Sequence, residues 1–141
     1  MKKVTFLPYP AAINLPPHTP IIAIGNPGQV YKYQQEYVHK LDVRFSDEVL
    51  KEGDVTFTIE HAEQILAFVN ALPEHSMLVV HCGQGVIRSP AIAKALSDHS
   101  DYTLEICYPG CLKSDIIMDR RAYYLMSEAI MEEVSSALDP S

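Results

Sequence analysis

The sequence predicts an α/β domain in which helices flank a mostly parallel central sheet. Apolar residues recur every three to four positions over residues 59–72, which is the spacing of a helix with one buried face, and again over about 119–137. Residues 77–80 form a continuous apolar run, typical of a strand that is buried on both faces. Helices alternating with buried strands favour a parallel sheet.

The N-terminal part of the chain predicts short extended segments joined by turns. Six of the ten prolines lie within the first 27 residues, which excludes a long helix there. Residues 4–7 and 21–24 are rich in β-favouring side chains and predict strands. The sequence Asn26-Pro27-Gly28 predicts a turn after the second of them. Residues 30–37 are too polar and too short a segment for an assignment.

The later elements follow from alternation and from capping signals. Residues 41–45 alternate apolar and polar side chains, the pattern of a strand with one buried face. Thr58 is the expected N-cap of the helix that follows it, and Ser89 followed by Pro90 predicts the start of another helix. Alternation over residues 104–108 predicts a short strand.

Length and composition predict a single domain over residues 1–141. With 48% hydrophobic residues, 141 residues suffice for one core and are too few for several domains. Acidic residues outnumber Lys and Arg by 18 to 11, and the formal charge of −7 argues against nucleic acid and anionic membranes as partners. The apolar runs are far shorter than the ~18 residues of a bilayer crossing. Because Pro8 and Pro10 also interrupt the start of the chain, we expect no secretion signal and a cytoplasmic protein.

One segment carries the chemistry that the sequence suggests. It lies between the apolar run at 77–80 and the helix expected near Ser89, and such strand-loop-helix connections bind anions. Its sequence is His81-Cys82-Gly83-Gln84-Gly85-Val86-Ile87-Arg88-Ser89. The two glycines let successive backbone N–H groups turn inward, and the Arg88 guanidinium adds a bidentate fork. Because these groups favour an anion, Cys82 is expected to act as a thiolate.

This segment resembles the signature of a known enzyme superfamily. The spacing C-x5-R, with His81 before the cysteine, Gly85 inside the loop and Ser89 after the arginine, is similar to the motif of cysteine-dependent protein tyrosine and dual-specificity phosphatases. A looser resemblance, in the order of the helices and strands, covers residues 41–98. The resemblance to this superfamily implies a phosphatase-like α/β fold. Because the chain is short, it is more similar to the compact, dual-specificity or bacterial type than to the larger tyrosine-specific domains.

The resemblance implies a role for each matched residue. Cys82 is expected to attack phosphorus and form a phosphocysteine that water hydrolyses, while Ser89 assists the departing thiolate. His81 is expected to organise the cysteine and its loop. The phosphate oxygens are expected to be held by the Arg88 side chain and by the backbone of Gly83, Gln84, Gly85, Val86, Ile87 and Arg88. The scheme needs no metal and no other cofactor, and the six histidines show no metal-ligand spacing.

The scheme also needs a general acid, and three aspartates compete for that role. Asp42 lies within the expected strand, on the polar side, and is interpreted as a solvated or structural carboxylate. Asp54 follows a glycine, as turn residues often do. Asp47 stands where the strand ends, at the edge of a parallel sheet where ligands bind, and is the favoured acid. Asp54 stays open as the alternative.

The expected partner is a phosphorylated protein or a small phosphate monoester. Phosphotyrosine ranks first, followed by phosphoserine or phosphothreonine, and the uncharged loop positions argue against phosphoinositides. One alternative is a non-catalytic module that binds phosphate or phosphopeptides. Another is thiol chemistry of the arsenate-reductase or sulfurtransferase kind, with Cys107 or Cys111 as a second thiol. The C-x3-C spacing of these two cysteines fits no usual zinc pair, and core packing is their simpler interpretation.

Overall fold

The computed structural model describes residues 2–46, 52–75, 77–83, 87–106 and 118–138. In these residues five strands form one sheet, in the order β3-β2-β4-β1-β5, with every neighbouring pair parallel. The strands are β1 (Lys2–Pro8), β2 (Ile21–Gly25), β3 (Lys40–Arg44), β4 (Met77–Cys82) and β5 (Tyr102–Leu104). The helices are α1 (Tyr9–Ala12), α2 (Ile59–Ala71), α3 (Arg88–His99) and α4 (Arg120–Leu138).

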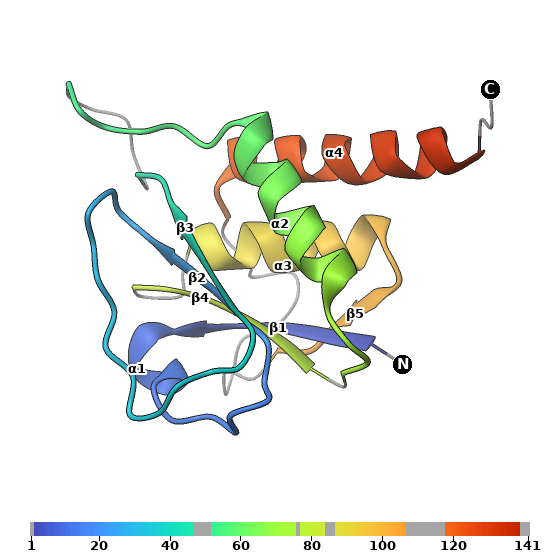
Figure 1. Cartoon of the computed structure of the whole chain (residues 1–141). Coiled ribbons are helices and arrows are strands. Elements are labelled where there is room, and N and C mark those ends of the chain that lie inside the picture. The colour runs from blue at the N-terminus through green and yellow to red at the C-terminus, as the bar shows by residue number, and fades with distance from the viewer. Residues whose placement is uncertain (1, 47–51, 76, 84–86, 107–117, 139–141) are drawn as a thin grey trace.

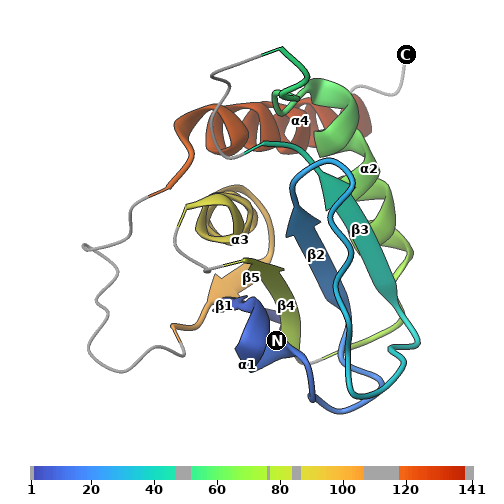
Figure 2. The same cartoon turned by 90° about the vertical axis from the view of Figure 1, so that its left-hand side faces the viewer.

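The helices α2, α3 and α4 cover one face of the sheet, as Figures 1 and 2 show. Strand β4 lies between β1 and β2, and five of its six residues are buried. Its residues Leu78, Val80 and Cys82 belong to the main core, which the apolar faces of the three helices complete. Because side chains alternate along a strand, Val79 and His81 of β4 face the other side.

The opposite face of the sheet is covered by α1 and by the connections that lead into β2 and β3 (Figure 1). A second, smaller core lies here, in which Tyr31 packs against Ile21, Ala23 and Val79. The connection between β2 and β3 has neither helix nor strand, which settles the segment 30–37 that the sequence left open. The sheet therefore has a helical layer on one side. On the other side lies an aromatic layer, which is formed by Tyr9, Tyr31, Tyr33 and Tyr37.

All strands point the same way, so their carboxyl ends meet at one edge of the sheet. At this edge β1 leads into Tyr9, β2 into Asn26, β3 into Phe45, and β4 ends at Cys82. Ligands of open parallel sheets bind outside this edge. The fold thus gathers residues from four separate segments around the end of β4.

The predicted α/β class, with a parallel sheet flanked by helices, is confirmed. Thr58 is the N-cap of α2 as expected, with a capping box in which the His61 side chain bonds back to the Thr58 N–H at 2.9 Å. The N-cap predicted for α3 is wrong, because the helix starts at Arg88 and places Ser89 inside its first turn. The short strand β5 begins earlier than predicted, at Tyr102, and residues 107 and 108 lie outside the described part of the chain.

Candidate active site

The sulfur of Cys82 lies at the start of α3. The distance from Cys82 Sγ to Ser89 Oγ is 3.3 Å, and the two residues are only 3% and 0% exposed. Ser89 is in the first turn of α3, so its hydroxyl is not used as a cap and points to the sulfur instead. The N-terminal end of a helix carries a partial positive charge, which favours an anion at this position. When the sulfur is ionised, the Ser89 hydroxyl is the group that donates the hydrogen bond.

Arg88 is anchored across the carboxyl edge of the sheet. Its side chain comes from the first residue of α3 and is only 7% exposed. Nη1 donates to Asn26 Oδ1 and to the Phe45 carbonyl, both at 2.9 Å, and the guanidinium lies 6.0 Å from the centre of the Phe45 ring. Asn26 follows β2 and Phe45 follows β3, so the ends of these two neighbouring strands both take part in placing this cation.

The loop between Cys82 and Arg88 is held at both of its ends. At the first end, the Tyr9 N–H donates to the Gly83 carbonyl at 3.2 Å, which extends the pairing of β1 with β4. At the other end, the Asp119 N–H donates to the Ile87 carbonyl at 3.0 Å. The anchors come from distant parts of the chain, and they fix the positions at which the loop leaves the strand and enters the helix.

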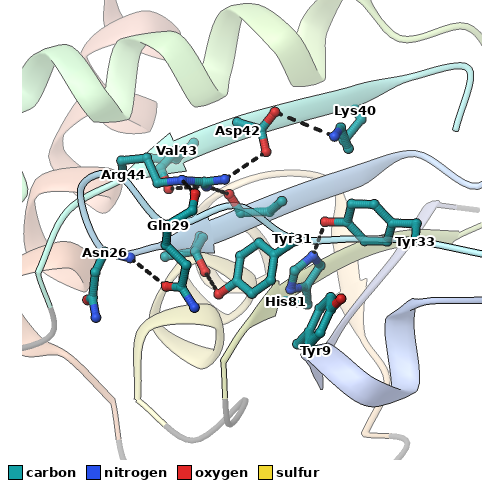
Figure 3. Close-up of polar contacts among 12 residues, drawn as sticks. Tyr9, Asn26, Gln29, Tyr31, Tyr33, Lys40, Asp42, Val43, Arg44 and His81 are labelled. Atoms are coloured by element: carbon teal, nitrogen blue, oxygen red, sulfur yellow. Dashed lines mark hydrogen bonds and ion pairs between the residues drawn. The ribbon is translucent and has the colours of Figure 1, made fainter. Parts of the chain in front are cut away.

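The His81 side chain lies among the rings of Tyr9, Tyr31 and Tyr33 (Figure 3), on the face of the sheet opposite to Cys82, because side chains alternate along a strand. It is fully buried, and its Nε2 lies 2.7 Å from the Tyr33 hydroxyl. The rings of Tyr9, Tyr31 and Tyr33 surround it, with centroid distances of 5.9, 4.8 and 5.8 Å. Burial lowers the pKa of His81 to about 4, so the ring is neutral near pH 7. His81 is therefore a packed, uncharged residue of the aromatic layer.

The aromatic layer is tied to the sheet by Tyr31 and Arg44. The Tyr31 hydroxyl donates to the Ile24 carbonyl at 2.6 Å, and burial raises its pKa, which keeps it a phenol. Arg44 donates from Nε to the Gln29 carbonyl and from Nη1 to the Ala23 carbonyl, both at 2.9 Å (Figure 3). These bonds hold the connection after β2 against the end of the sheet.

The structure brings some of the predicted site residues together. Cys82, Arg88 and Ser89 meet where β4 ends and α3 begins, with Gly83 and Ile87 at the two ends of the loop and His81 behind it. The other predicted positions, Asp47, Gln84, Gly85, Val86, Cys107 and Cys111, lie outside the described residues.

The two other candidate acids are described. Asp42 is exposed on β3 and pairs with Arg44 at 3.1 Å and with Lys40 at 3.6 Å, which agrees with a structural role. Asp54 is half-buried. Its neighbour Val55 exchanges two hydrogen bonds with Ser46, at 2.7 and 3.0 Å, so Asp54 lies beside the segment that leaves β3.

The sequence did not indicate the contact of Asn26 with Arg88 or that of Tyr33 with His81. Asn26 was interpreted only as a turn residue, although its position at the carboxyl end of a buried parallel strand was a usable signal. Tyr33 lies 48 positions before His81, in a segment without periodicity, and no local pattern indicates its contact.

Among the described residues, no three His, Cys, Asp or Glu side chains are grouped so that they could hold a metal ion. No helix in the described ranges combines the length and the apolar character needed to cross a membrane.

Comparisons with protein-family models, with curated proteins and with solved structures find no match.

The depressed pKa of His81 predicts a pH dependence of stability. Between pH 6.5 and about 4 the unfolded chain binds a proton at this ring and the folded protein does not. The contribution of His81 to the free energy of unfolding is therefore fully present above pH 6.5. Lowering the pH to about 4 removes about 3 kcal/mol of it. In urea unfolding between pH 7 and 4, His81→Asn should show a shallower loss of unfolding free energy than the wild type. His99→Asn, at the end of α3, is the control, and an unchanged slope in His81→Asn would contradict the assignment.

Proposed function

We propose that the protein is a cysteine-dependent phosphatase that hydrolyses phosphate monoesters through a phosphocysteine. The observation that carries the proposal is the placement of Cys82 Sγ at the N-terminus of α3, 3.3 Å from the Ser89 hydroxyl. A thiol at a helix N-terminus is suited to be a nucleophile, because the positive end of the helix favours the thiolate. Arg88, anchored in the same turn, supplies the positive charge that a phosphoryl group needs.

The proposed reaction has two steps. In the first, the Cys82 thiolate attacks phosphorus, the S–P bond forms, and the ester P–O bond breaks. The leaving oxygen takes a proton from a carboxylic acid, Asp47 in this proposal and Asp54 as the alternative. In the second step water attacks phosphorus, the same carboxylate accepts its proton, and the S–P bond breaks. The Ser89 hydroxyl stabilises the returning thiolate by donating a hydrogen bond to it, and inorganic phosphate leaves.

The proposed substrate is a phosphorylated protein, with phosphotyrosine ahead of phosphoserine and phosphothreonine. The proposed compartment is the cytoplasm, because the nucleophile must stay reduced. The support for this substrate class is the resemblance of the loop to the signature of protein phosphatases. A phosphate-binding module without turnover is the competing function, since the Arg88 anchor and the α3 N-terminus need no acid to bind an anion.

The experiment is p-nitrophenyl phosphate hydrolysis in EDTA, measured against pH for the wild type, Asp47→Asn and Asp54→Asn. We expect turnover by the wild type without metal. The rate should fall on the alkaline side, where the general acid is ionised, and replacing the acid should remove that fall and lower kcat about 10²- to 10⁴-fold. The variant that does so identifies the acid. A folded, reduced wild type that binds tungstate without hydrolysing any phosphate ester, phosphotyrosine peptides included, would favour the binding module.

A further inference from the structure

We propose that Asn26 is a positioning residue that decides which edge of the Arg88 guanidinium faces the substrate. The consequence for catalysis rests on the proposed phosphatase function, while the placement of Arg88 stands on the structure alone. Asn26 follows β2, whereas Arg88 begins α3, 62 positions later in the chain.

The first step of the argument is the hydrogen-bond inventory of Arg88. A guanidinium is planar and has five N–H donors, two of which belong to Nη1. Both Nη1 hydrogens are used, one by Asn26 Oδ1 and one by the Phe45 carbonyl, each at 2.9 Å. Within the described part of the chain, Nε and Nη2 make no hydrogen bond. The edge formed by Nε and Nη2 presents two parallel donors, which is the geometry that binds two oxygens of a phosphate.

The second step is that the Asn26 side chain is not needed for its own turn. The turn is built from backbone groups, because the Gln29 N–H donates to the Asn26 carbonyl at 2.9 Å. Pro27 and Gly28 occupy its two central positions, and the φ of +83° at Gly28 suits a type II turn. The Gln29 side chain caps the Asn26 N–H at 2.9 Å, and Arg44 holds the Gln29 carbonyl (Figure 3). The backbone of Asn26 is thus held in place, and its side-chain amide is left to accept the hydrogen bond from Arg88.

The third step concerns the charge of the partner. A carboxylate at position 26 would accept the same hydrogen bond but would offset part of the positive charge of Arg88. The neutral amide of Asn26 orients the guanidinium and leaves its full charge for the oxyanion. The identity of the residue as an amide, and not only its presence, therefore matters for anion affinity.

The test compares Asn26→Ala and Asn26→Asp with the wild type by two measurements that do not depend on turnover. One is the affinity for tungstate, a phosphate-shaped anion, measured by calorimetry. The other is the NMR signal of the Arg88 side chain, whose Nη groups are resolved when rotation of the guanidinium is restrained. The signal is assigned from its loss in Arg88→Lys. Asn70→Ala, which removes the amide that bonds Glu133 on the helical face at 2.6 Å, is the matched control.

We expect Asn26→Ala to lose the resolved Nη signals and to bind tungstate about tenfold more weakly, the effect of one charge-assisted hydrogen bond. Asn26→Asp should keep the resolved signals, because the acceptor remains, and still bind tungstate more weakly. Asn70→Ala should change neither quantity. In aryl phosphate hydrolysis, Asn26→Ala should lower kcat more than it raises KM. The reason is that the Nε–Nη2 edge of Arg88, which Asn26 orients, matters most when negative charge develops on the substrate in the transition state.

The outcomes separate this inference from the proposed function. If Asn26→Ala keeps the resolved signals and binds tungstate like the wild type, the inference is overturned, even when hydrolysis is confirmed. If the wild type binds tungstate and hydrolyses no phosphate ester, the proposed function fails, and the signals and affinities of the variants still decide the role of Asn26. A wild type that binds no tungstate overturns both.

Discussion

Cys82→Ser should abolish p-nitrophenyl phosphate hydrolysis while the protein continues to bind tungstate. The serine hydroxyl is nearly isosteric with the thiol but stays protonated at neutral pH, so no nucleophile remains, and we expect kcat to fall at least about 10⁴-fold. Binding should persist because Arg88 and the N-terminus of α3 are unchanged. The anion affinity should stay within about threefold of the wild type, since no positive charge is removed.

The measurement pairs a hydrolysis assay in EDTA with calorimetry on the same samples. Ser127→Ala is a suitable control, because that buried hydroxyl donates to the Tyr123 carbonyl within α4, a helix that carries neither Cys82 nor Arg88. Residual hydrolysis by Cys82→Ser close to the wild-type rate would refute Cys82 as the nucleophile. Loss of tungstate binding in a folded Cys82→Ser would show that the sulfur itself holds the anion.

Arg88→Lys should reduce kcat/KM by about 10²- to 10⁴-fold, which corresponds to two charge-assisted hydrogen bonds. A lysine keeps the charge but presents a single nitrogen. It cannot bond both Asn26 and Phe45 and also offer two parallel donors to a phosphoryl group. The loss should appear in kcat and in tungstate affinity together.

The control for Arg88→Lys is Arg121→Lys. Arg121 also donates to a backbone carbonyl, that of Phe57 at 2.8 Å, but it is exposed at the start of α4. We expect wild-type kcat/KM from Arg121→Lys. If Arg88→Lys retains wild-type kcat/KM, charge alone is enough at this position, and the oriented guanidinium has no part in the reaction.

The parts of the site that the sequence predicted are those that neighbouring residues encode. Cys82, Arg88 and Ser89 fall within one strand-loop-helix connection, so their spacing alone places them at a helix N-terminus. Helix α2 was predicted for the same reason, because its stripe and its N-cap are local signals. The start of α3 was misplaced because the capping rule assigns the Ser89 hydroxyl to the backbone, whereas the fold offers it the Cys82 sulfur.

The parts that the sequence did not predict depend on contacts between distant segments. The bond from Arg88 to Asn26 spans 62 positions and that from His81 to Tyr33 spans 48, and neither leaves a periodic trace. The start of β5 was predicted too late in the chain, because an alternating pattern is compatible with several starting residues. The pairing of Lys2 with Tyr102 determines which of them begins the strand. Helix α1 is only four residues long, below the length at which a helical stripe can be recognised.

The pairing of β2 with β4 gives the site a sensitivity to misalignment. Ala23 lies opposite His81 in this pair, so Asn26 and Arg88 meet only in the native alignment of the two strands. A shift of β2 by two residues would keep its apolar side chains on the same faces, so hydrophobic burial discriminates weakly against it. It would nevertheless displace Asn26 by about 6.6 Å, beyond the reach of a hydrogen bond. Oxyanion affinity is therefore a stricter criterion of correct refolding than secondary-structure content, which such a misaligned protein would retain.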